Sequence, residues 1–306
     1  MIIEIFLPLV LGGALLAGGG EALVAGGAGT ARRLGLSPIV IGVLLIGFGT
    51  STPELLTSIE AARLGSPDIA LGNVIGSNTA NILLIGGVAA LLAPMALQRE
   101  HYRFDLWVAV FVALTLGLAM LAGPLTPMLG ALFLLSLAVY ALVALARGGT
   151  ASDEPVEMRP VLWRSLLIAA GGLVAALLGA RLFVEGAVEL ARMFSISEAV
   201  IGATIVAVGT SLPELATSVM AARRGHPELA VGNILGSNVF NILGVLGATL
   251  MVGEIAPSAE AVWRDMPAML AATAALVFVI LVRGRMSRAG GVALIAGYAG
   301  YLALML

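Results

Sequence analysis

The stretch Gly49-Thr50-Ser51-Thr52-Pro53-Glu54 interrupts a long apolar run, and Gly209-Thr210-Ser211-Leu212-Pro213-Glu214 repeats it later in the chain. Proline inside a helix donates no N–H and clashes with the preceding turn, so each copy predicts a helix break that frees the carbonyls of Gly49 and Gly209. At membrane depth, free carbonyls and carboxylates persist only where they line a cavity or hold a ligand. The two copies therefore predict an oxygen-rich, anionic site suited to a hard metal cation.

The composition is that of a membrane protein. The 306 residues are 60% hydrophobic and 11% charged, with a mean hydropathy of +1.07, whereas a soluble domain is about 25% charged. The absence of cysteine excludes disulfides and thiolate metal sites. The sequence has no nucleic-acid motif, nucleophile–base set or catalytic metal-ligand motif. An enzyme is therefore not expected, and no cofactor, nucleic-acid partner or protein partner is implied.

About 20 apolar residues span a bilayer, and ten stretches approach that length. Their expected bounds are 3–30, 38–62, 70–93, 105–122, 125–146, 162–189, 198–222, 229–252, 266–282 and 288–306. The longest polar connector, 147–160, separates a first five-helix half (1–146) from a second (161–306). The other connectors are short, so no soluble domain is expected.

The two halves share an internal repeat. A shift of 160 positions aligns 41–86 with 201–246 and gives 24 identities among 46 pairs. Because five crossings is an odd number, the second half must insert upside down relative to the first, which is a recurrent transporter design. We therefore predict an all-α membrane protein of ten transmembrane helices, built as two inverted five-helix repeats with broken second and seventh helices.

Arginine predicts the orientation, because connectors rich in basic residues stay in the cytoplasm. One set of alternate connectors carries twelve arginines: Arg32, Arg33, Arg99, Arg103, Arg147, Arg159, Arg164, Arg223, Arg224, Arg283, Arg285 and Arg288. The other set carries only Arg63, Arg192 and Arg264. The linker 147–160 is therefore expected in the cytoplasm and both termini outside.

A polar ladder follows each predicted break. Asn73, Ser77 and Asn81 recur every four residues and so share one helix face, and Asn233, Ser237 and Asn241 repeat them. Such residues can simply hold helices together by interhelical hydrogen bonds. For the asparagines at 73, 78, 233 and 238, helix packing and support of a site are equally good interpretations. For Ser77, Asn81, Ser237 and Asn241 we favour an ion site, because packing alone does not require a glutamate beside each break.

The oxygen count suits calcium, which takes about 6–8 oxygen ligands. Glu54 and Glu214 supply four oxygens, and the carbonyls near Thr50 and Thr210 supply two more. Hydroxyl and amide oxygens suit flanking monovalent ions: those of Ser51, Ser77, Ser211, Ser237, Asn81 and Asn241. Ser51 or Thr52 can also cap the second half-helix, with Glu54 in its first turn.

Two facing carboxylates give the empty site a charge near −2, which is costly to bury. One divalent ion neutralises this charge, and so do several monovalent ions. An empty site should therefore cross between the two membrane faces poorly, which makes exchange the natural mode of transport. Protons should compete for the same carboxylates.

The paired GTS-x-PE and GN-x-x-GSN-x-x-N segments resemble the two alpha repeats of the cation/calcium antiporter superfamily, and most closely its prokaryotic sodium/calcium exchangers. The resemblance implies that calcium is held by Glu54 and Glu214 with the carbonyls of Thr50 and Thr210. It also implies sodium sites formed by Ser51, Ser77, Ser211, Ser237 and the carbonyls of Gly47 and Ala207. The implied setting is a prokaryotic inner (cell) membrane, with calcium and sodium as transported substrates.

In one respect the chain departs from that family. Its members often carry aspartate at one of the positions matching Asn81 and Asn241, and here both are asparagine. Only two core carboxylates remain, which leaves the ion stoichiometry and the driving ion open.

Glycines recur every seven residues in the first and sixth predicted helices. They are Gly12, Gly19 and Gly26, and Gly172, Gly179 and Gly186. The resemblance implies alternating access in which these two helices slide across the other eight, and a smooth glycine stripe fits such sliding. Tight static packing explains the stripe equally well. Bulky residues at Gly19 or Gly179 that slow turnover but spare ion affinity would favour sliding.

Other functions remain as alternatives. A proton/calcium or potassium-dependent exchanger shares the class, although proton/calcium exchangers generally depart from the GTS-x-PE pattern. A cation channel lined by the broken helices would conduct without a counter-ion. An anion carrier is disfavoured by two core glutamates without a matching arginine. A purely structural protein would not need costly carboxylates in both of its halves.

Overall fold

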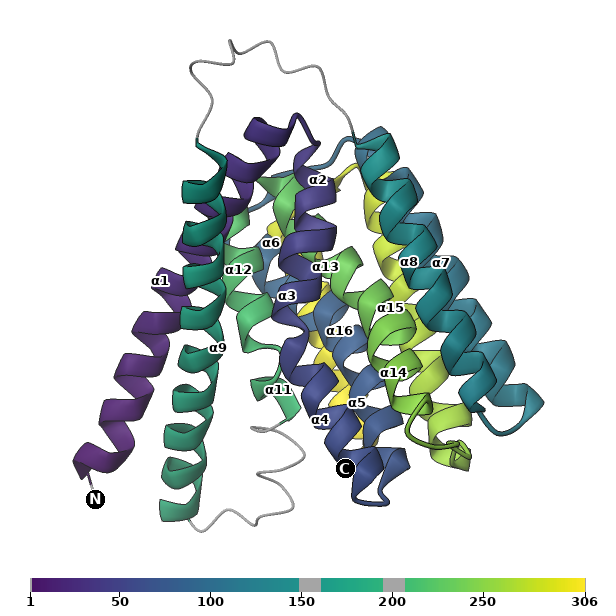
Figure 1. Cartoon of the computed structure of the whole chain (residues 1–306). Coiled ribbons are helices and arrows are strands. Elements are labelled where there is room, and N and C mark those ends of the chain that lie inside the picture. Colours follow the sequence, from purple (N-terminus) through teal and green to yellow (C-terminus); the bar gives the residue numbers. More distant parts are fainter. Residues whose placement is uncertain (1, 149–160, 195–206, 306) are drawn as a thin grey trace.

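The computed structural model describes residues 2–148, 161–194 and 207–305, and these form a bundle of helices (Figure 1). The elements of the first half are α1 (Ile2–Leu34), α2 (Pro38–Ile41), η1 (Gly42–Gly47), α3 (Phe48–Thr50), α4 (Thr52–Arg63), α5 (Pro67–Ala80), η2 (Asn81–Ile85), α6 (Gly86–Leu92), β1 (Met95–Ala96), α7 (Arg99–Ala122) and α8 (Pro127–Arg147). Those of the second half are α9 (Leu162–Met193), α11 (Ala207–Gly209), α12 (Leu212–Arg223), α13 (Pro227–Phe240), η5 (Asn241–Leu246), α14 (Gly247–Leu250), η6 (Ala261–Asp265), α15 (Met266–Val277), η7 (Phe278–Arg283), β2 (Arg285–Met286) and α16 (Arg288–Met305). The elements named η are π-helical segments, most of them within longer helices.

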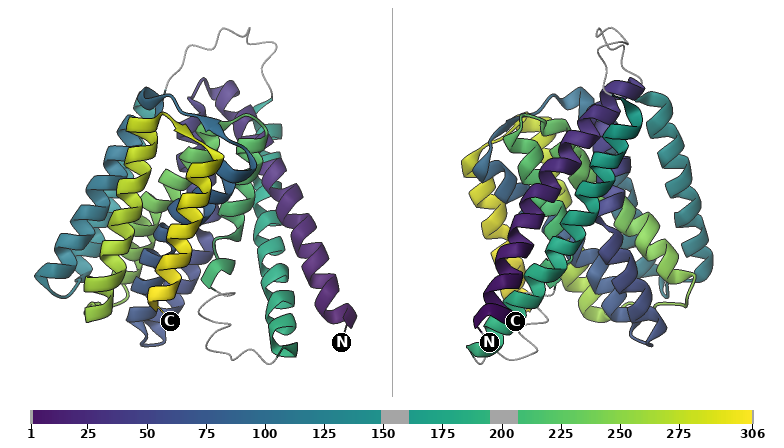
Figure 2. Two further views of the ribbon diagram at one scale, coloured as in Figure 1. Left: turned by 180° about the vertical axis from the view of Figure 1, so that it is seen from behind. Right: turned by 60° about the vertical axis from the view of Figure 1, so that its left-hand side comes forward.

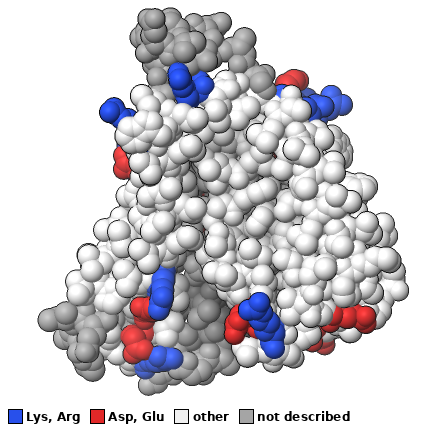
Figure 3. All heavy atoms as spheres, viewed as in Figure 1, with Lys and Arg blue, Asp and Glu red and all other residues white. Residues whose placement is uncertain are grey.

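The described part contains eight helices long and apolar enough to cross a membrane, or nine when the bent pair Pro38–Thr50 and Thr52–Arg63 counts as one span. The chain is thus an all-helical membrane protein, apart from two strands of two residues each. Charged side chains on the face in Figure 3 gather toward the two ends and leave a broad uncharged band. The expected span 198–222 is described only from residue 207 onward, and most of the linker 147–160 lies outside the described residues.

Most expected helix bounds agree with the structure within a few residues, but α7 begins at Arg99 rather than at 105. Its first turn is polar and largely exposed, from Arg99 to His101. Hydropathy identifies only the apolar part of a spanning helix, so it misses a polar turn that extends beyond the apolar part. Similarly, α5 begins at Pro67, where proline fits the first helical turn.

Helices α1 and α9 run antiparallel, side by side, along one side of the bundle (Figures 1 and 2). Their glycines face each other. A Cβ atom on Gly19 would lie 2.5 Å from the Ala176 backbone nitrogen, and one on Gly172 would lie 2.4 Å from that of Leu23. Gly12 meets Gly179 and Phe183 in the same way. The stripe therefore packs α1 against α9, as the tight-packing interpretation requires.

Two short backbone pairings tie the connectors together at opposite ends of the bundle. Strand β1 pairs with β2, so that Met95 lies opposite Met286. Leu125 and Ile255 exchange two backbone hydrogen bonds of 2.7 and 3.0 Å. The length of α7 separates the two pairings along the chain. The chain termini lie at the same end of the bundle (Figure 1).

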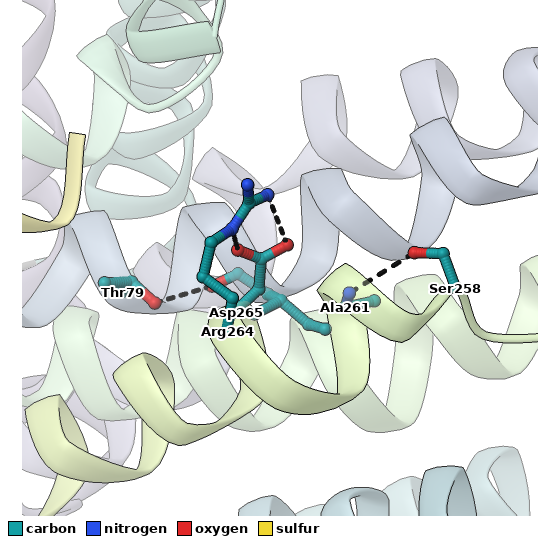
Figure 4. Close-up of polar contacts among 6 residues, drawn as sticks. Thr79, Ser258, Ala261, Arg264 and Asp265 are labelled. Atoms are coloured by element: carbon teal, nitrogen blue, oxygen red, sulfur yellow. Dashed lines mark hydrogen bonds and ion pairs between the residues drawn. The ribbon is translucent and has the colours of Figure 1, made fainter. Parts of the chain in front are cut away.

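Buried acids near the ends of the spanning helices have partners of their own. Asp265 is 8% exposed, and Arg264 contacts both of its carboxylate oxygens, at 2.7 and 3.3 Å (Figure 4). Its repeat-related counterpart Asp105 is 5% exposed and accepts a 2.7 Å hydrogen bond from the hydroxyl of Tyr140. These acids are therefore neutralised or hydrogen-bonded locally.

The centre of the bundle is formed by α5 and α13. The spanning segments that begin with these helices, Pro67–Leu92 and Pro227–Leu250, are the most buried of the described spans. Helix α13 approaches η1 closely because both carry glycines at the contact. A Cβ atom on Gly236 would lie 2.5 Å from the carbonyl oxygen of Val43, and one on Gly47 would lie 2.9 Å from the nitrogen of Ser237. This approach brings the polar ladder of α13 against the broken helix of the first half.

Candidate functional site

The first predicted break is present as a 43° bend between Pro38–Thr50 and Thr52–Arg63, at Ser51. In the second half α11 ends at Gly209 and α12 begins at Leu212. The expectation of a free carbonyl at Gly49 was wrong, because the Thr52 hydroxyl donates a 2.7 Å hydrogen bond to it. A threonine side chain can reach back to a carbonyl of the preceding turn and replace the N–H that proline lacks.

Capping of α4 by Ser51 or Thr52 was also wrong. The Ser51 side chain makes no capping hydrogen bond, and Thr52 is engaged with Gly49. Ser51 instead donates to Glu214 across the two halves. Glu54 does lie in the first turn of α4, as expected.

The two glutamates are buried and linked crosswise. Glu54 is 0% and Glu214 is 1% exposed. The Ser51 hydroxyl donates to Glu214 Oε1 at 3.0 Å, and the Ser211 hydroxyl donates to Glu54 Oε1 at 3.1 Å. Each carboxylate therefore interacts with the break motif of the other half, which brings the two motifs together in the core.

Four buried side-chain oxygens of this region have no hydrogen-bond partner within the described part of the chain. They are Glu54 Oε2, Glu214 Oε2, Asn81 Oδ1 and Asn241 Oδ1. A buried acceptor without a donor costs free energy, about 1–3 kcal/mol and more when charged, unless something else satisfies it. All four are acceptors, so the group that satisfies them must be a cation or a donor such as water.

The asparagines form a network between α5–η2 and α13–η5. Asn81 Nδ2 donates to Asn238 Oδ1 at 3.0 Å, and Asn241 Nδ2 donates to Asn78 Oδ1 at 3.2 Å. Asn78 and Asn238 each donate to the other's backbone carbonyl at 3.3 Å. The amide nitrogens of Asn81 and Asn241 are thus engaged, and their oxygens are the atoms left free.

Thr50, Gly47 and Ser237 form a second contact between the halves. Ser237 is fully buried, and its hydroxyl donates to the Gly47 carbonyl at 3.1 Å. The Thr50 hydroxyl donates to the carbonyl of Ile46 at 3.0 Å and lies 3.2 Å from Asn233 Oδ1. The expected ligand carbonyl of Gly47 therefore lies beside the expected ligand hydroxyl of Ser237.

The remaining expected site residues lie at the positions that the shift of 160 relates to those already described. Ser77 is 5% exposed in α5, and Ser211 is 3% exposed at the second break. Thr210 is half-buried between α11 and α12. Ala207 begins α11 at the edge of the described part, directly after residues 195–206, so the surroundings of its carbonyl lie outside it.

Sequence reasoning left the role of Asn73 and Asn233 open and missed their serine partners, Ser58 and Ser218. Asn73 Nδ2 donates to the Glu54 carbonyl at 3.2 Å and to the Ser58 hydroxyl at 2.9 Å. In the second half the same contacts, at the same lengths, join Asn233 to Glu214 and Ser218. A signal was available, because Ser58 and Ser218 are identical across the repeat and lie one turn after each glutamate.

The chemistry of this donor set is that of a hard-cation site. It combines two carboxylates with hydroxyl, amide and carbonyl oxygens, and the described residues hold no cluster of three or more His, Cys, Asp or Glu side chains. Hard cations such as calcium take oxygen ligands of these kinds, whereas nitrogen and sulfur ligands suit softer metals.

Comparison with known proteins agrees with this chemistry. The family described as "Sodium/calcium exchanger protein" matches residues 5–146 and 164–306. The putative antiporter CaxA of Alkalimonas amylolytica is 38% identical over 97% of both chains. The sodium/calcium exchanger MaX1 of Methanosarcina acetivorans is 30% identical over 100% of this chain and 99% of its own.

Among solved structures, the sodium-calcium exchanger NCX_Mj soaked with zero Na+ and Ca2+ superimposes with a TM-score of 0.88. The two sequences are 30% identical, and the match covers both chains completely. The matched segments include both break motifs and both polar ladders, which carry the candidate site. The chain belongs to the sodium/calcium exchanger family and is a membrane transporter for cations.

Proposed function

We propose that the protein is a secondary antiporter that exchanges calcium for sodium across the membrane by alternating access. The observation that carries this proposal is the pair of buried glutamates, each hydrogen-bonded to the serine of the other half and each with one oxygen that has no partner among the described residues. Calcium binds between Glu54 and Glu214, because a divalent cation satisfies both oxygens and neutralises both charges. The carbonyls of Thr50 and Thr210 complete the calcium ligands.

Sodium binds at flanking positions built from neutral oxygens. The contact of Ser237 with the Gly47 carbonyl supports one such site, and Ser77 with the Ala207 carbonyl forms its repeat-related counterpart. Ser51 and Ser211 join these sites to the glutamates. The unpartnered oxygens of Asn81 and Asn241 support a further position for a monovalent ion. Because sodium and calcium share the glutamates, one displaces the other, and protons compete for the same oxygens.

The overall plan we propose is ten transmembrane helices in two inverted repeats, 1–146 and 161–306, joined by a cytoplasmic linker at 147–160. Support comes from mirrored contacts. The strands at positions 95–96 and 285–286 pair at one end of the bundle, and positions 125 and 255, which the shift of 160 relates to 285 and 95, pair at the other. The match of the family to residues 5–146 and again to 164–306 fits the same plan.

For alternating access we propose that α1 and α9 move as one unit across the rest of the bundle. The glycine contacts between them support this, because backbones this close cannot slide separately without repacking. During this movement α1 passes α12, where a Cβ atom on Gly20 would lie 3.1 Å from the backbone of Ala216. The contact between Gly20 and Ala216 lies next to the break motif of the second half.

For location we propose a prokaryotic cell membrane with both termini outside. The arginine bias between alternate connectors supports this orientation. The ends of α1, α8 and α12 all carry arginine in their last turn. Arg147 at the end of α8 lies over the ring of Phe104 near the start of α7, so these connectors meet at one end of the bundle.

The test is calcium uptake into proteoliposomes under a sodium, potassium or proton gradient. Wild type is compared with Glu54→Gln and Glu214→Gln, and Glu60→Gln on the exposed side of the same helix α4 is the matched control. We expect uptake driven by sodium at equal pH, and a loss of more than about 100-fold in both site variants, since removing groups that merely orient a ligand already costs about 10–100-fold. The control should retain uptake.

Each other outcome points to a different function. Uptake driven by a proton gradient without sodium indicates a proton/calcium exchanger, and an added requirement for potassium indicates a potassium-dependent one. Calcium movement without any counter-ion indicates a channel. Near-normal exchange in either glutamine variant contradicts the site.

A further inference from the structure

An ion pair joins helix α1 to α12, away from the buried glutamates. The carboxylate of Glu21, within α1, contacts the guanidinium of Arg224, which directly follows the last residue of α12. Close to this ion pair, the backbones of the two helices approach each other at Gly20 and Ala216. The ion pair therefore ties the unit formed by α1 and α9 to the rest of the bundle.

The repeat supplies no counterpart of this ion pair. The shift of 160 relates Glu21 of α1 to Arg181 of α9, and it relates Arg224 to Leu64, which directly follows α4. An arginine and a leucine cannot form an ion pair. Arg181 instead contacts Glu185 of its own helix at 2.9 Å. The electrostatic tie is thus confined to one of the two repeat-related positions.

The two positions also differ in how they are covered. Ala216 of α12 lies against α1, whereas Leu56, its counterpart on α4, is 64% exposed. In the proposed inverted plan, the opposite state of the transporter exchanges these roles, so that α9 lies against α4 as α1 lies against α12 here. Only the state with α1 against α12 then gains an ion pair at this contact.

We propose that Glu21 and Arg224 are positioning residues for the transport cycle, whose ion pair stabilises the state with α1 against α12 and breaks in the opposite state. This inference rests on the proposed movement of α1 and α9. The side chains of Glu21 and Arg224 are 44% and 55% exposed, so the stabilisation is that of an ion pair in contact with solvent. Such a pair changes the ratio of two states by about two- to fivefold.

The first test measures the populations of the two states in lipid nanodiscs. Spin labels on Leu64→Cys and Met193→Cys report the distance between the ends of α4 and α9, which lie at the same end of the bundle (Figure 1). Both positions are exposed, and the chain has no cysteine of its own. We expect Glu21→Gln and Arg224→Gln to raise the ratio of the shorter to the longer distance about two- to fivefold. Arg181→Gln, at the repeat-related position, is the matched control and should leave this ratio unchanged.

The second test separates the charge of the two side chains from their shape. Exchange of the two residues, Glu21→Arg together with Arg224→Glu, should restore the wild-type ratio of distances. Choline chloride at about 1 M should raise the ratio in wild type, because salt screens charges in contact with solvent, and should leave that of Glu21→Gln unchanged. A double exchange that does not restore the ratio overturns the inference, and so does a wild type that salt does not affect.

Failure of this inference differs from failure of the proposed function. Distances that respond to calcium and sodium, but not to Glu21→Gln or Arg224→Gln, overturn only the role of the ion pair. A single distance that neither ion nor any of these variants changes overturns the movement of α1 and α9 and the proposed alternating access with it.

Discussion

Ser51 and Ser211 each donate a hydrogen bond to the glutamate of the opposite half, at 3.0 and 3.1 Å. A donor directed at a carboxylate stabilises its ionised form, and hydrogen bonds to charged groups contribute about 1.5–3 kcal/mol. The two serines therefore affect the competition between protons and calcium. Loss of the donor favours the protonated carboxylate, which cannot hold the cation as well.

We predict that Ser51→Ala and Ser211→Ala move the pH of half-maximal calcium flux upward. The shift should be about 1 pH unit, the equivalent of about 1.5 kcal/mol. Flux in proteoliposomes over a pH series measures it. Ser136→Ala is the matched control, because that hydroxyl lies on an exposed face of α8 and bonds to the carbonyl of Leu132. An unchanged pH profile in both site variants would show that the hydroxyls do not stabilise the ionised glutamates.

At this scale the sequence selected candidate site residues but not their hydrogen-bond partners. Repetition between the halves was enough to select Glu54, Glu214, Asn81 and Asn241. It could not reveal that Thr52 satisfies the Gly49 carbonyl, since Leu212 replaces Thr52 in the second copy and only the local backbone geometry decides that contact. Which side chain a hydroxyl bonds depends on distances within 1 Å, and residue spacing does not fix these.

Among the elements, α1 and α9 depend on glycine for their packing. Gly19 meets the backbone of Ala176 at a distance that leaves no room for a Cβ atom, whereas the adjacent Gly18 has no atom within 4 Å among the described residues. The pair thus offers an internal control within one helix. Periodicity predicted the stripe but not what it faces, because a period defines a helix face and says nothing about the neighbouring element.

We predict that Gly19→Ala lowers the thermal unfolding midpoint in detergent and that Gly18→Ala does not. Overpacking at a backbone contact costs about 1–3 kcal/mol, whereas alanine in an open helical position gains up to about 1 kcal/mol. Gly172→Ala and Gly171→Ala repeat the comparison on α9, since Gly171 also has open space around it. Equal midpoints for the two members of each pair would mean that the stripe is not a tight contact.

The hydropathy pattern predicted the spanning helices but not the π-helical segments within them. Segments η2 and η5 begin at Asn81 and Asn241, the two asparagines with unpartnered oxygens. A π-helical turn shifts the register of the residues after it, and such turns are frequent at functional sites. Segment η2 packs against α12 and η5 packs against α4, and a hydropathy pattern within one helix does not report such contacts.

Taken as a whole, the molecule has two ends that differ in charge and are related by the repeat. Ala96 and Ala256 occupy equivalent positions 160 residues apart. Both are exposed; Ala96 belongs to the β1–β2 pairing at one end, and Ala256 follows Ile255 of the pairing at the other. The chain has no cysteine, so a single introduced cysteine reports on one position without a background signal.

We predict that Ala256→Cys reacts with a membrane-impermeant maleimide in intact cells, and that Ala96→Cys reacts only after the cells are permeabilised. The reason is that the connector containing Ala96 and the adjoining start of α7 belong to the arginine-rich set, which we propose to be cytoplasmic. Labelling of both variants after permeabilisation controls for accessibility of the thiol. Reaction of Ala96→Cys alone in intact cells would reverse the orientation. Reaction of both would place the two connectors on the same side, and the inverted repeat could not hold.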